Sequence, residues 1–351
     1  APRCFEIEEK LQAQVDIPVF HDDQHGTAVV VSAAVINAAK LTGRKLSDMT
    51  AVINGAGAAG TAIAKMLLNL GIRDIVACDS KGILTRDRGD LNEAKKRLAA
   101  VTNEEQISGS LADAVSGRDL FIGVSAAKVL TQDMVRSMNK DAIIFAMANP
   151  EPEILPDLAK EAGAAVVGTG RSDYPNQINN VIGFPYIFRG ALDTQAKAIN
   201  EEMKIAAVHA IANLAKQPVP DVVNEAYHVN NFTFGPEYFI PKPVDPRLIT
   251  EVSIAVARAA MESGVARKNI EDWDGYKTHL RELMGQESQL TRQLYDTARR
   301  HPQRVVFAEG GHPNMLKAAV EAKAEGICHP IILGNEERIE KLAKELDLSL
   351  E

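Results

Sequence analysis

The sequence predicts an α/β protein with a doubly wound parallel sheet, and three features of the chain lead to this expectation. Between residues 50 and 170, short apolar runs alternate with segments that have the apolar spacing of amphipathic helices. A glycine-rich turn joins the first apolar run to the helix that follows it. The expected strands are almost wholly apolar, which is typical of a parallel sheet covered by helices on both faces.

The N-terminal residues are expected to hold the end of a helix, a short strand and a second helix. Residues 5–14 are interpreted as the helix end, and "IPVF" at 17–20 as a short strand that tolerates its proline at the start or on an edge. Residues 27–40 are apolar and helix-forming. Thr27 is expected to cap this helix, because its hydroxyl can accept a hydrogen bond from an unpaired backbone N–H.

An alternating series of strands and helices follows. Strands are expected at 50–57, 74–79, 119–125, 142–150 and 164–170, and the first of these ranges includes the turn that follows its strand. The expected helices between them lie at 58–70, 90–101, 131–139 and 153–162. Residues 171–190 are expected to be irregular. Further helices are expected at about 191–216 and 247–263, around a proline-rich region at 217–245.

A second series of strands and helices begins near the C-terminal end of the sequence. A polar helix is expected at about 286–300, followed by strands at 304–311 and 329–335, each leading into a helix. Two strands do not make a stable domain on their own. Either residues 286–351 dock on the rest of the chain, or they are the first β-α units of a second, larger α/β domain that has been cut.

Composition and charge limit the classes of partner. The 351 residues carry a net charge of −8, from 39 basic and 47 acidic residues. This balance argues against a nucleic-acid surface and favours small-molecule substrates. The longest apolar run, residues 27–39, is too short to cross a membrane. The cysteines Cys4, Cys78 and Cys328 lie far apart, so we expect no disulfide framework and a cytoplasmic location.

The segment "VINGAGAAG" places three glycines in the spacing G-x-G-x-x-G. It follows an apolar strand and opens a helix, which is the setting of the dinucleotide-binding turn in Rossmann-type sheets. The first glycine allows the tight turn, the second the close approach of a pyrophosphate, and the third close packing of helix on strand. The alternative is a merely structural turn. The residues expected to contact NAD(P) here are Gly55, Ala56, Gly57, Ala58, Ala59 and Gly60.

The end of the next strand carries the residues that would choose between NAD and NADP. Asp79 lies where a carboxylate would bond the ribose 2′-hydroxyl, which favours NAD. Ser80 and Lys81 follow it, and they could meet a 2′-phosphate with help from Arg86 or Arg88. We favour NADP, because the neighbouring lysine offsets the acid, and NAD remains the alternative. The other interpretation is a solvated loop with ordinary charges.

Two adjacent aspartates, Asp22 and Asp23, lie between the expected short strand and the apolar helix, in "VFHDDQHGTA". Neighbouring side chains in an extended segment point in opposite directions, so we expect the two to do different work. One would face a hard divalent cation such as Mg²⁺ or Mn²⁺, and the other would orient a base or bond the cofactor. Alternatively, both are acids that stabilise the helix N-terminus. His21 and His25 are candidate ligands, although histidines beside a helix start are more often polar surface.

The chain resembles the malic enzyme family in five ordered segments, namely "IPVFHDDQHGTA", "VINGAGAAG", "DSKG", "FAMANP" and "NQINNVIGFPYIFRGALD". The resemblance is to the bacterial hybrid, bifunctional form, in which a phosphate acetyltransferase-like domain follows the malic enzyme part. Residues from about 290, with "RVVFAEGGHPNMLKAA" and "IILGN", resemble the start of that domain. The resemblance implies the end of an N-terminal catalytic domain at 1–40, an NAD(P)-binding domain at 41–285 and a truncated second domain at 286–351.

The resemblance also implies a reaction, in which L-malate is oxidised with NADP or NAD and decarboxylated to pyruvate with the help of Mg²⁺ or Mn²⁺. Asp23 matches a metal ligand of the family. Asp22 matches the adjacent acid of the catalytic site, which interacts with the family's catalytic lysine. Asn149 and Asn180 match the amides that bind malate and the nicotinamide region, with Asn179 as a companion. Without the resemblance, these asparagines would be interpreted as polar turn and loop residues.

A further contact with the cofactor is expected where the strand at 119–125 ends. Val124, Ser125 and Ala126 lie where the resemblance places a loop on the nicotinamide side. This position agrees with the rule that ligands of open parallel sheets bind at the carboxyl ends of the strands.

The resemblance places several catalytic groups of the family outside this sequence. The tyrosine acid, the lysine base and a Glu-Asp pair of metal ligands are expected to precede Ala1, and Lys10 and Lys40 lie outside the motif of the base. We therefore expect an internal piece of a longer enzyme, and no malate oxidation by the 351-residue chain alone. A regulatory C-terminal domain that senses acetyl-CoA and a homo-oligomeric enzyme are expected on the same ground.

Two other functions remain as alternatives. The first is a different NAD(P)-dependent oxidoreductase, such as an amino-acid dehydrogenase, which would use the same nucleotide fold without a metal. The second is a regulatory or assembly piece whose cofactor site is vestigial. The glycine turn, the aspartate pair and the asparagines together argue against the second alternative, because packing alone would not retain all of them.

Overall fold

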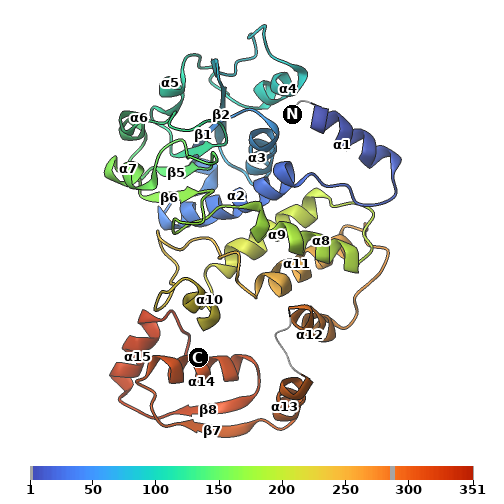
Figure 1. The fold of residues 1–351 in the computed structure, drawn as a ribbon, viewed down its shortest axis with the longest axis vertical. Helices are drawn as coiled ribbons and strands as arrows, with labels where there is room; N and C mark the ends of the chain where they lie inside the picture. The colour runs from blue at the N-terminus through green and yellow to red at the C-terminus, as the bar shows by residue number, and fades with distance from the viewer. Residues whose placement is uncertain (1–2, 285–288, 351) are drawn as a thin grey trace. The chain divides into compact units, whose positions relative to one another are not determined.

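The computed structural model describes residues 3–284 and 289–350, and the chain forms two compact units (Figure 1). The first unit consists of residues 1–215 and 234–271. The second consists of residues 216–233 and 272–351. All strands of the large sheet therefore belong to the first unit.

The first unit is built on a six-stranded sheet in the order β3-β2-β1-β4-β5-β6. Its strands are β1 (Thr50–Asn54), β2 (Asp74–Asp79), β3 (Gly82–Ile83), β4 (Leu120–Gly123), β5 (Ile143–Ala146) and β6 (Val166–Thr169). Neighbouring strands pair in parallel, except that the short β3 runs antiparallel to β2. The chain moves outward from β1 to β2 and then returns to β4 on the other side of β1. The strand order thus reverses between β1 and β4, which is where open sheets of this kind bind their ligands.

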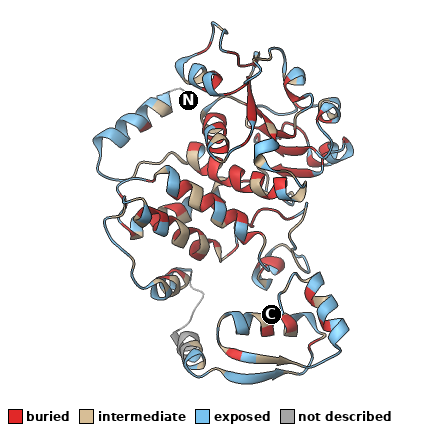
Figure 2. Cartoon of the chain, turned by 180° about the vertical axis from the view of Figure 1, so that it is seen from behind, coloured by how far each residue is buried: buried red, intermediate tan, exposed pale blue. Residues whose placement is uncertain are grey.

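Helices cover both faces of this sheet, as the apolar strands predicted. Along β1, Ala51 and Ile53 belong to one hydrophobic core and Val52 to the other, because successive side chains of a strand point to opposite faces. The first core includes residues of α2, α3 and α4, and the second includes residues of α5, α6 and α7 (Figures 1 and 2). These helices are α2 (Asp22–Leu41), α3 (Ala58–Asn69), α4 (Glu93–Val101), α5 (Leu111–Val115), α6 (Gln132–Ser137) and α7 (Pro156–Glu161). The doubly wound α/β fold is therefore confirmed.

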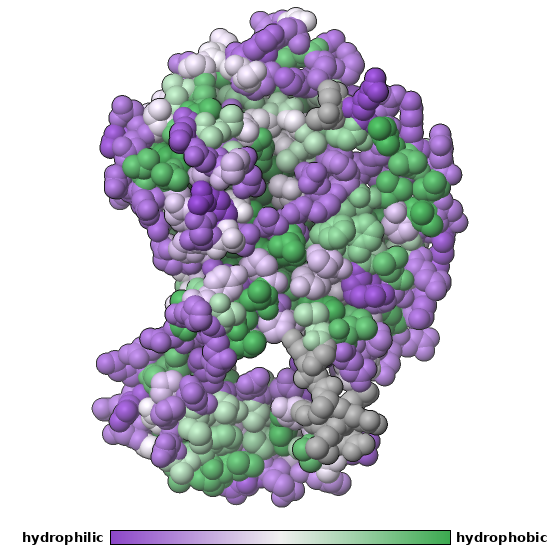
Figure 3. Space-filling model, in the orientation of Figure 1, coloured by the Kyte–Doolittle hydropathy of each residue, from purple (hydrophilic) through white to green (hydrophobic). Residues whose placement is uncertain are grey.

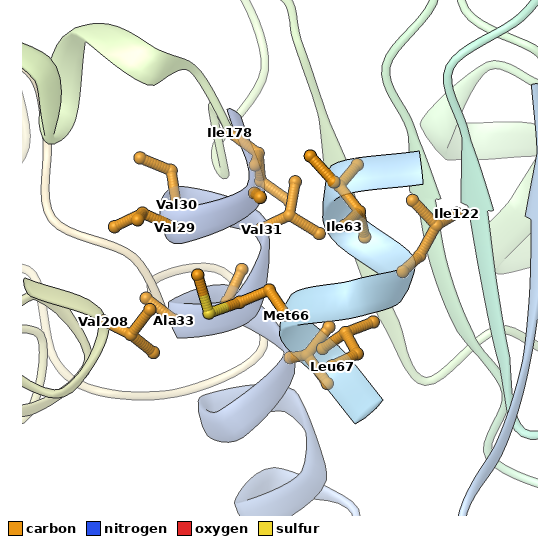
Figure 4. Close-up of a cluster of buried hydrophobic side chains, with 14 of the residues drawn as sticks. Val29, Val30, Val31, Ala33, Ile63, Met66, Leu67, Ile122, Ile178 and Val208 are labelled. Atoms are coloured by element: carbon orange, nitrogen blue, oxygen red, sulfur yellow. The ribbon is translucent and has the colours of Figure 1, made fainter. Parts of the chain in front are cut away.

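Helix α2 is the central helix of the first unit and is buried over most of its length (Figure 2). Its small and β-branched residues let α3 and α9 (Glu201–Leu214) pack closely on either side. Figure 4 shows Val31 beside Ile63 of α3, and Ala33 between Met66 of α3 and Val208 of α9. Burial of each valine contributes about 1.5–3 kcal/mol. Packing thus fixes the helix that carries the aspartate pair at its N-terminal end.

The structure corrects the prediction for the N-terminal residues. Helix α1 (Arg3–Gln14) forms as expected, but residues 17–20 pair with no strand of the described chain. Helix α2 begins at Asp22 and not at Thr27, which lies inside it. The carboxylate of Glu8 accepts hydrogen bonds from the backbone just before the helix and from a glutamine in its first turn, which explains the early start. Both aspartates therefore lie on the first turn of a helix.

The chain after β6 is more helical than expected. Helix α8 (Phe184–Asp193) begins inside the stretch that was expected to be irregular. Its proline lies in the first turn, where a missing N–H costs nothing. The single helix expected at 191–216 is instead the end of α8 followed, after a turn, by α9. Helix α11 (Leu248–Glu262) agrees with the prediction, and α8 and α9 both pack against it.

Several short elements escaped the prediction because they span too few residues to show a periodic pattern. They are β3, α5 and α10 (Asp221–Ala226), together with the 3₁₀ helices η1 (Leu46–Asp48) and η2 (Asn180–Ile182). The longer strands and helices expected between residues 50 and 170 are confirmed, with ends that differ by a few residues.

The second unit contains a parallel pair of strands, β7 (Gln303–Phe307) and β8 (Cys328–Ile332), as expected. Its helices are α10, α12 (Trp273–Leu283), α13 (Gln289–Arg300), α14 (Pro313–Ala324) and α15 (Glu336–Glu345). Among its described residues, Leu316, Ile339 and Ala343 form a small hydrophobic cluster. Apolar side chains of this unit remain on the surface (Figure 3), among them Val306, which is 54% exposed.

The expected domain boundaries near residues 40 and 285 stay predictions. Helix α2 ends at the first of these positions and shares a core with α3 beyond it. The second position lies inside the second unit. No helix of the described residues is long and apolar enough to cross a membrane.

Candidate functional site

A cleft with a volume of about 340 Å³ lies at the carboxyl ends of the central strands. Its walls come from the start of α2, the start of α3, the loops that follow β4, β5 and β6, and η2. The lining residues are Asp23, Thr27, Ala59, Val124, Ser125, Met147, Ala148, Asn149, Gly170, Ile178, Asn179 and Asn180. The cleft therefore lies beside the point where the strand order reverses, between β1 and β4.

The glycine turn has the conformation that a dinucleotide requires. Gly55 has φ +117°, and a Cβ there would lie 2.5 Å from the Val124 carbonyl oxygen. A Cβ on Gly60 would lie 1.9 Å from the Gly55 carbonyl oxygen, so helix and strand approach closely at this point. Gly57, by contrast, has nothing within 4 Å of its Cβ position and begins α3 without a side-chain cap. This leaves open space at a helix N-terminus, which is the arrangement that receives a pyrophosphate.

The other predicted residues of the turn, Ala56, Ala58 and Ala59, lie around the same helix start. Of the whole turn, only Ala59 also lines the cleft. The turn would therefore hold the middle of a dinucleotide, and the cleft would receive one of its ends.

Asp79 ends β2 and is surrounded by cations. Both of its oxygens accept from Arg88, at 3.0 and 3.2 Å, and Oδ2 also accepts from Lys95 Nζ at 2.6 Å. The Lys81 backbone N–H donates to Oδ1 at 2.9 Å. Burial favours the protonated acid, but the hydrogen bonds from Arg88 and Lys95 outweigh it and hold the pKa of Asp79 below its usual range. The carboxylate is thus ionised, and its charge is offset by two cations.

The cations expected near a 2′-phosphate are arranged differently from the prediction. Lys81 pairs through Nζ with Asp90 at 2.8 Å and is well exposed, and Ser80 lies in the exposed turn beside it. Arg88 bridges Asp79 and Asp90. Sequence reasoning missed Lys95, which lies in the first turn of α4, because nothing in the sequence brings that turn to the end of β2.

The two aspartates have different surroundings. Asp23 lines the cleft, whereas Asp22 Oδ2 accepts a hydrogen bond from the Asn180 side-chain nitrogen behind it. Asp22 Oδ1 is buried and has no hydrogen-bond partner among the described residues. Burial and the charge of Asp23 raise the pKa of Asp22, against the hydrogen bond from Asn180. The two residues are consecutive on a helix and not on a strand, and their surroundings differ, while the roles expected for them stay predictions.

Glycine is required one turn further along α2. A Cβ at Gly26 would lie 1.8 Å from Asp22 Oδ1 and 3.3 Å from the Cβ of Asn180. Gly26 therefore leaves the space in which the carboxylate of Asp22 meets η2. This contact could not be predicted from sequence, because it joins residues that are far apart in the chain.

The histidines beside the aspartates lie outside the lining of the cleft. The His25 Nε2 atom lies 2.9 Å from Glu8 Oε1, and its ring contacts Phe20 with centroids 5.4 Å apart. Neither His21 nor His25 lines the cleft. Within residues 3–284 and 289–350, no three side chains of His, Cys, Asp or Glu gather as a metal site. Asp23 is therefore the carboxylate that these residues offer to an ion in the cleft.

The three asparagines meet in the cleft although they come from two distant segments. Asn149 follows β5, and Asn179 and Asn180 follow β6. Asn179 accepts from the Val181 N–H at 3.0 Å and so begins η2. Val124 and Ser125 join them from the end of β4, whereas Ala126 does not line the cleft.

The fold and the glycine turn define a dinucleotide-binding α/β protein with an acidic and amide-rich cleft at the switch point of its sheet. Residues 24–225 match the family model "Malic enzyme, NAD binding domain", and residues 289–351 match "Phosphate acetyl/butaryl transferase". The chain belongs to the malic enzyme family. The predicted resemblance is confirmed, and its first part matches the NAD-binding domain of that family.

Curated relatives match the chain from end to end. It is 48% identical over 354 residues to the NADP-dependent malic enzyme of Haemophilus influenzae, and the match covers 100% of this chain and 46% of that protein. It is 44% identical to the NAD-dependent malic enzyme of Rhizobium meliloti, over 97% of this chain and 44% of that protein. The chain thus spans about half the length of the curated relatives that it matches.

Solved structures of the same family share the fold. The malic enzyme of Pyrococcus horikoshii superposes with a TM-score of 0.73 and 41% identity, covering 81% of this chain and 64% of that one. The malic enzyme of Entamoeba histolytica also gives a TM-score of 0.73, with 35% identity over 84% of this chain and 60% of that one.

Proposed function

We propose that this protein takes part in the oxidative decarboxylation of L-malate to pyruvate and CO2, with NADP or NAD as the hydride acceptor. The observation that supports the proposal is the cleft, in which Asp23, Ser125, Asn149 and Asn180 meet beside the dinucleotide turn. Four segments of the sequence contribute these residues, and packing alone gives no reason for them to converge. The names of the curated relatives point to the same reaction.

The proposed roles follow from the donors and acceptors that each residue offers. Asn149 and Asn180 would bind the carboxylate and hydroxyl oxygens of malate through their amide groups. Because Asp22 accepts from the Asn180 nitrogen, that amide is held in one orientation. The loop with Val124 and Ser125 would contact the nicotinamide, since it follows the strand next to the glycine turn.

Asp22 is a positioning residue in this proposal. Its second oxygen is buried without a partner among the described residues, so it can accept one more hydrogen bond. The catalytic lysine that the family resemblance implies would be a fitting donor. Such a contact would also offset the burial of the carboxylate, because an unpaired buried charge is costly.

The donor set of the cleft fits a divalent cation. Mg²⁺ and Mn²⁺ prefer oxygen ligands and are often held by one or two carboxylates together with substrate and water. Asp23 would supply one carboxylate ligand, with amide oxygens close by in the same cleft. A bound cation would polarise the C2 oxygen of malate and stabilise the enolate that remains after CO2 leaves.

NADP is the cofactor that the end of β2 favours. Arg88 and Lys95 neutralise Asp79, so the acid no longer repels a 2′-phosphate. Lys81 extends into solvent at the same turn and is only loosely held by Asp90, because exposed ion pairs contribute little. These three cations would bind a phosphate that NAD lacks.

The second unit would serve regulation. Its match to the phosphate acetyl/butaryl transferase family supports a site for an acyl-CoA, and we propose acetyl-CoA as the effector. The enzyme would act as a homo-oligomer. The effector is tested by measuring whether acetyl-CoA inhibits or activates malate oxidation. The oligomeric state is tested by light scattering, which gives the mass of the protein in solution. Kinetics insensitive to acetyl-CoA, or a monomer, would contradict these two proposals.

The reaction itself is tested with this chain expressed as part of an enzyme of its relatives' length, because the 351 residues alone are expected to be inactive. The assay contains L-malate, Mn²⁺ and NADP. The proposal predicts equal amounts of NADPH, pyruvate and CO2, and loss of all three when Asn180 is replaced by alanine. Reduction of NADP with oxaloacetate as the final product, or turnover that is unchanged when the divalent ion is chelated, would contradict it.

A further inference from the structure

The proposed function leaves unused a fully buried carboxylate behind the cleft, that of Glu153. The residue is 0% exposed. One oxygen accepts from the Ser125 N–H at 2.9 Å and from the Ser125 hydroxyl at 3.2 Å, and the other accepts from the Ala148 N–H at 3.0 Å. Glutamate is almost never fully buried unless it is paired, so these three donors are what keeps the group in place.

The partners of Glu153 lie in two different walls of the cleft. Ser125 follows β4 and Ala148 follows β5, and both line the cleft. The Asn54 side chain at the end of β1 also donates to the Ser125 hydroxyl oxygen, at 2.8 Å. One buried hydrogen-bonded chain thus connects the carboxyl ends of β1, β4 and β5, on either side of the switch point.

The last residue of β4 is shaped for this carboxylate. A Cβ on Gly123 would lie 2.3 Å from Glu153 Cδ and 2.5 and 2.7 Å from its two oxygens. Its φ gives no reason for glycine here, since it lies outside the left-handed region. Glycine is therefore required for space and not for backbone conformation, and the space belongs to the side chain of Glu153.

We propose that Glu153 is a positioning residue for hydride transfer. By fixing the loops after β4 and β5 to each other, it sets where Ser125 meets the nicotinamide and where Asn149 meets the substrate. The inference rests on the proposed function for the identity of the substrate. The claim that the Glu153 carboxylate couples the two walls of the cleft depends only on its hydrogen bonds to Ser125 and Ala148.

The decisive variant is Glu153→Gln, which keeps the shape of the side chain. The new side-chain amide has one oxygen and one NH₂ group. The NH₂ group would face the backbone N–H of either Ser125 or Ala148, so that wall of the cleft would lose its hydrogen bond. Displacement of a catalytic group by about 1 Å can cost about 10²-fold in rate, and we expect kcat/KM for malate to fall about 10- to 100-fold. The primary isotope effect with malate deuterated at C2 should rise, because hydride transfer becomes slower than the other steps. The affinity for 2′,5′-ADP should stay within about twofold, since that probe occupies the end of the site near β2.

The chain offers a matched control in Asp119, a buried carboxylate at the opposite end of the same sheet. It accepts from the Thr50 N–H and from the Asn139 side chain, both at 2.8 Å, and so joins the starts of β1 and β4. Asp119→Asn should lower Tm as Glu153→Gln does, but it should leave kcat/KM and the isotope effect unchanged. Equal kinetics of the two variants, measured below both Tm values, would show that Glu153 is merely structural and would overturn the proposal.

The variant Ser125→Ala tests the inference if Glu153→Gln does not fold, and the fluorescence of bound NADPH tests it if malate is not oxidised. Ser125→Ala keeps the backbone hydrogen bond to Glu153 and removes only the hydroxyl, so it should fold and show a smaller effect in the same direction. If the enzyme of the relatives' length does not oxidise malate without any substitution, the proposed function fails on its own. Nicotinamide fluorescence of bound NADPH then still tests Glu153, because Glu153→Gln should reduce its enhancement while 2′,5′-ADP binds as before. Unchanged fluorescence would overturn the positioning role.

Discussion

Replacing Gly26 with alanine tests whether the first turn of α2 positions the amide of Asn180. The new Cβ would lie 1.8 Å from Asp22 Oδ1, against a floor of about 3.0 Å for real Cβ contacts. The carboxylate must therefore move by about 1.2 Å, the difference between these two values. Because its other oxygen holds the Asn180 nitrogen, the movement breaks or stretches that hydrogen bond.

The expected magnitudes follow from two opposing contributions to stability. A hydrogen bond to a charged group contributes about 1.5–3 kcal/mol, whereas alanine in place of glycine inside a helix gains about 0.5–1 kcal/mol. The free energy of unfolding should therefore fall by about 0.5–2.5 kcal/mol. The kcat/KM for malate should fall about 10²-fold, because the amide loses its fixed orientation.

Urea unfolding and steady-state kinetics measure the two effects, and a double variant isolates their cause. When Asp22 is already alanine, the added Cβ meets no carboxylate and keeps only the 3.3 Å contact with the Asn180 Cβ, so Gly26→Ala should then cost much less stability or none. Ser32→Ala, at a buried hydroxyl of α2 without a partner among the described residues, is the control and should leave kinetics unchanged. An equal loss of stability from Gly26→Ala with and without Asp22 would refute the reasoning.

Three further predictions address the cofactor, the ion and the pH dependence of stability. Lys95→Ala should lower the ratio of kcat/KM for NADP over NAD about 10-fold or more, because one of the two cations that offset the charge of Asp79 is lost; an unchanged ratio would show that the lysine has no such role. Asp23→Asn should weaken Mn²⁺ binding about 10-fold or more in an electron paramagnetic resonance titration, with 2′,5′-ADP affinity unaltered; equal Mn²⁺ affinity would place the ion elsewhere. Burial lowers the pKa of Lys242 from 10.5 to about 8, so between these values the unfolded chain binds a proton that the folded chain does not. Stability in urea should thus rise with pH over this interval and be lost as pH falls towards 8, and Lys242→Met should remove this slope; a slope equal to that of the parent would contradict the assignment.

The parts of the fold that could be predicted from sequence are those with a strong local signal. The glycine turn was recognisable because its spacing, set between an apolar strand and a helix, is typical of a dinucleotide site. The strands between residues 50 and 170 were recognisable because burial on both faces makes them wholly apolar. The strand expected at 17–20 was wrong because it has no strand to pair with among the described residues. Ile17 is 63% exposed and Phe20 contacts the rings of His25 and Phe188, which a short apolar run cannot reveal.

The parts of the site that were missed depend on contacts between distant segments. Glu153 resembles an ordinary surface acid in "NPEPEILP", and only the approach of the loops after β4 and β5 explains its burial. Lys95 and Gly26 were missed for the same reason, since their partners Asp79 and Asn180 are brought to them by the sheet and by η2. Family resemblance supplied Asn149, Asn180 and Asp23, and the structure adds that they share one cleft.

The most direct measurement of the central claim is the relaxation of NADP protons by Mn²⁺ bound to the protein. If Asp23 holds the ion beside the nicotinamide end of the cofactor, the nicotinamide C4 proton should relax much faster than the adenine protons, and Asp23→Asn should abolish the difference. Faster relaxation of the adenine protons, or a relaxation that does not depend on Asp23, would contradict the account.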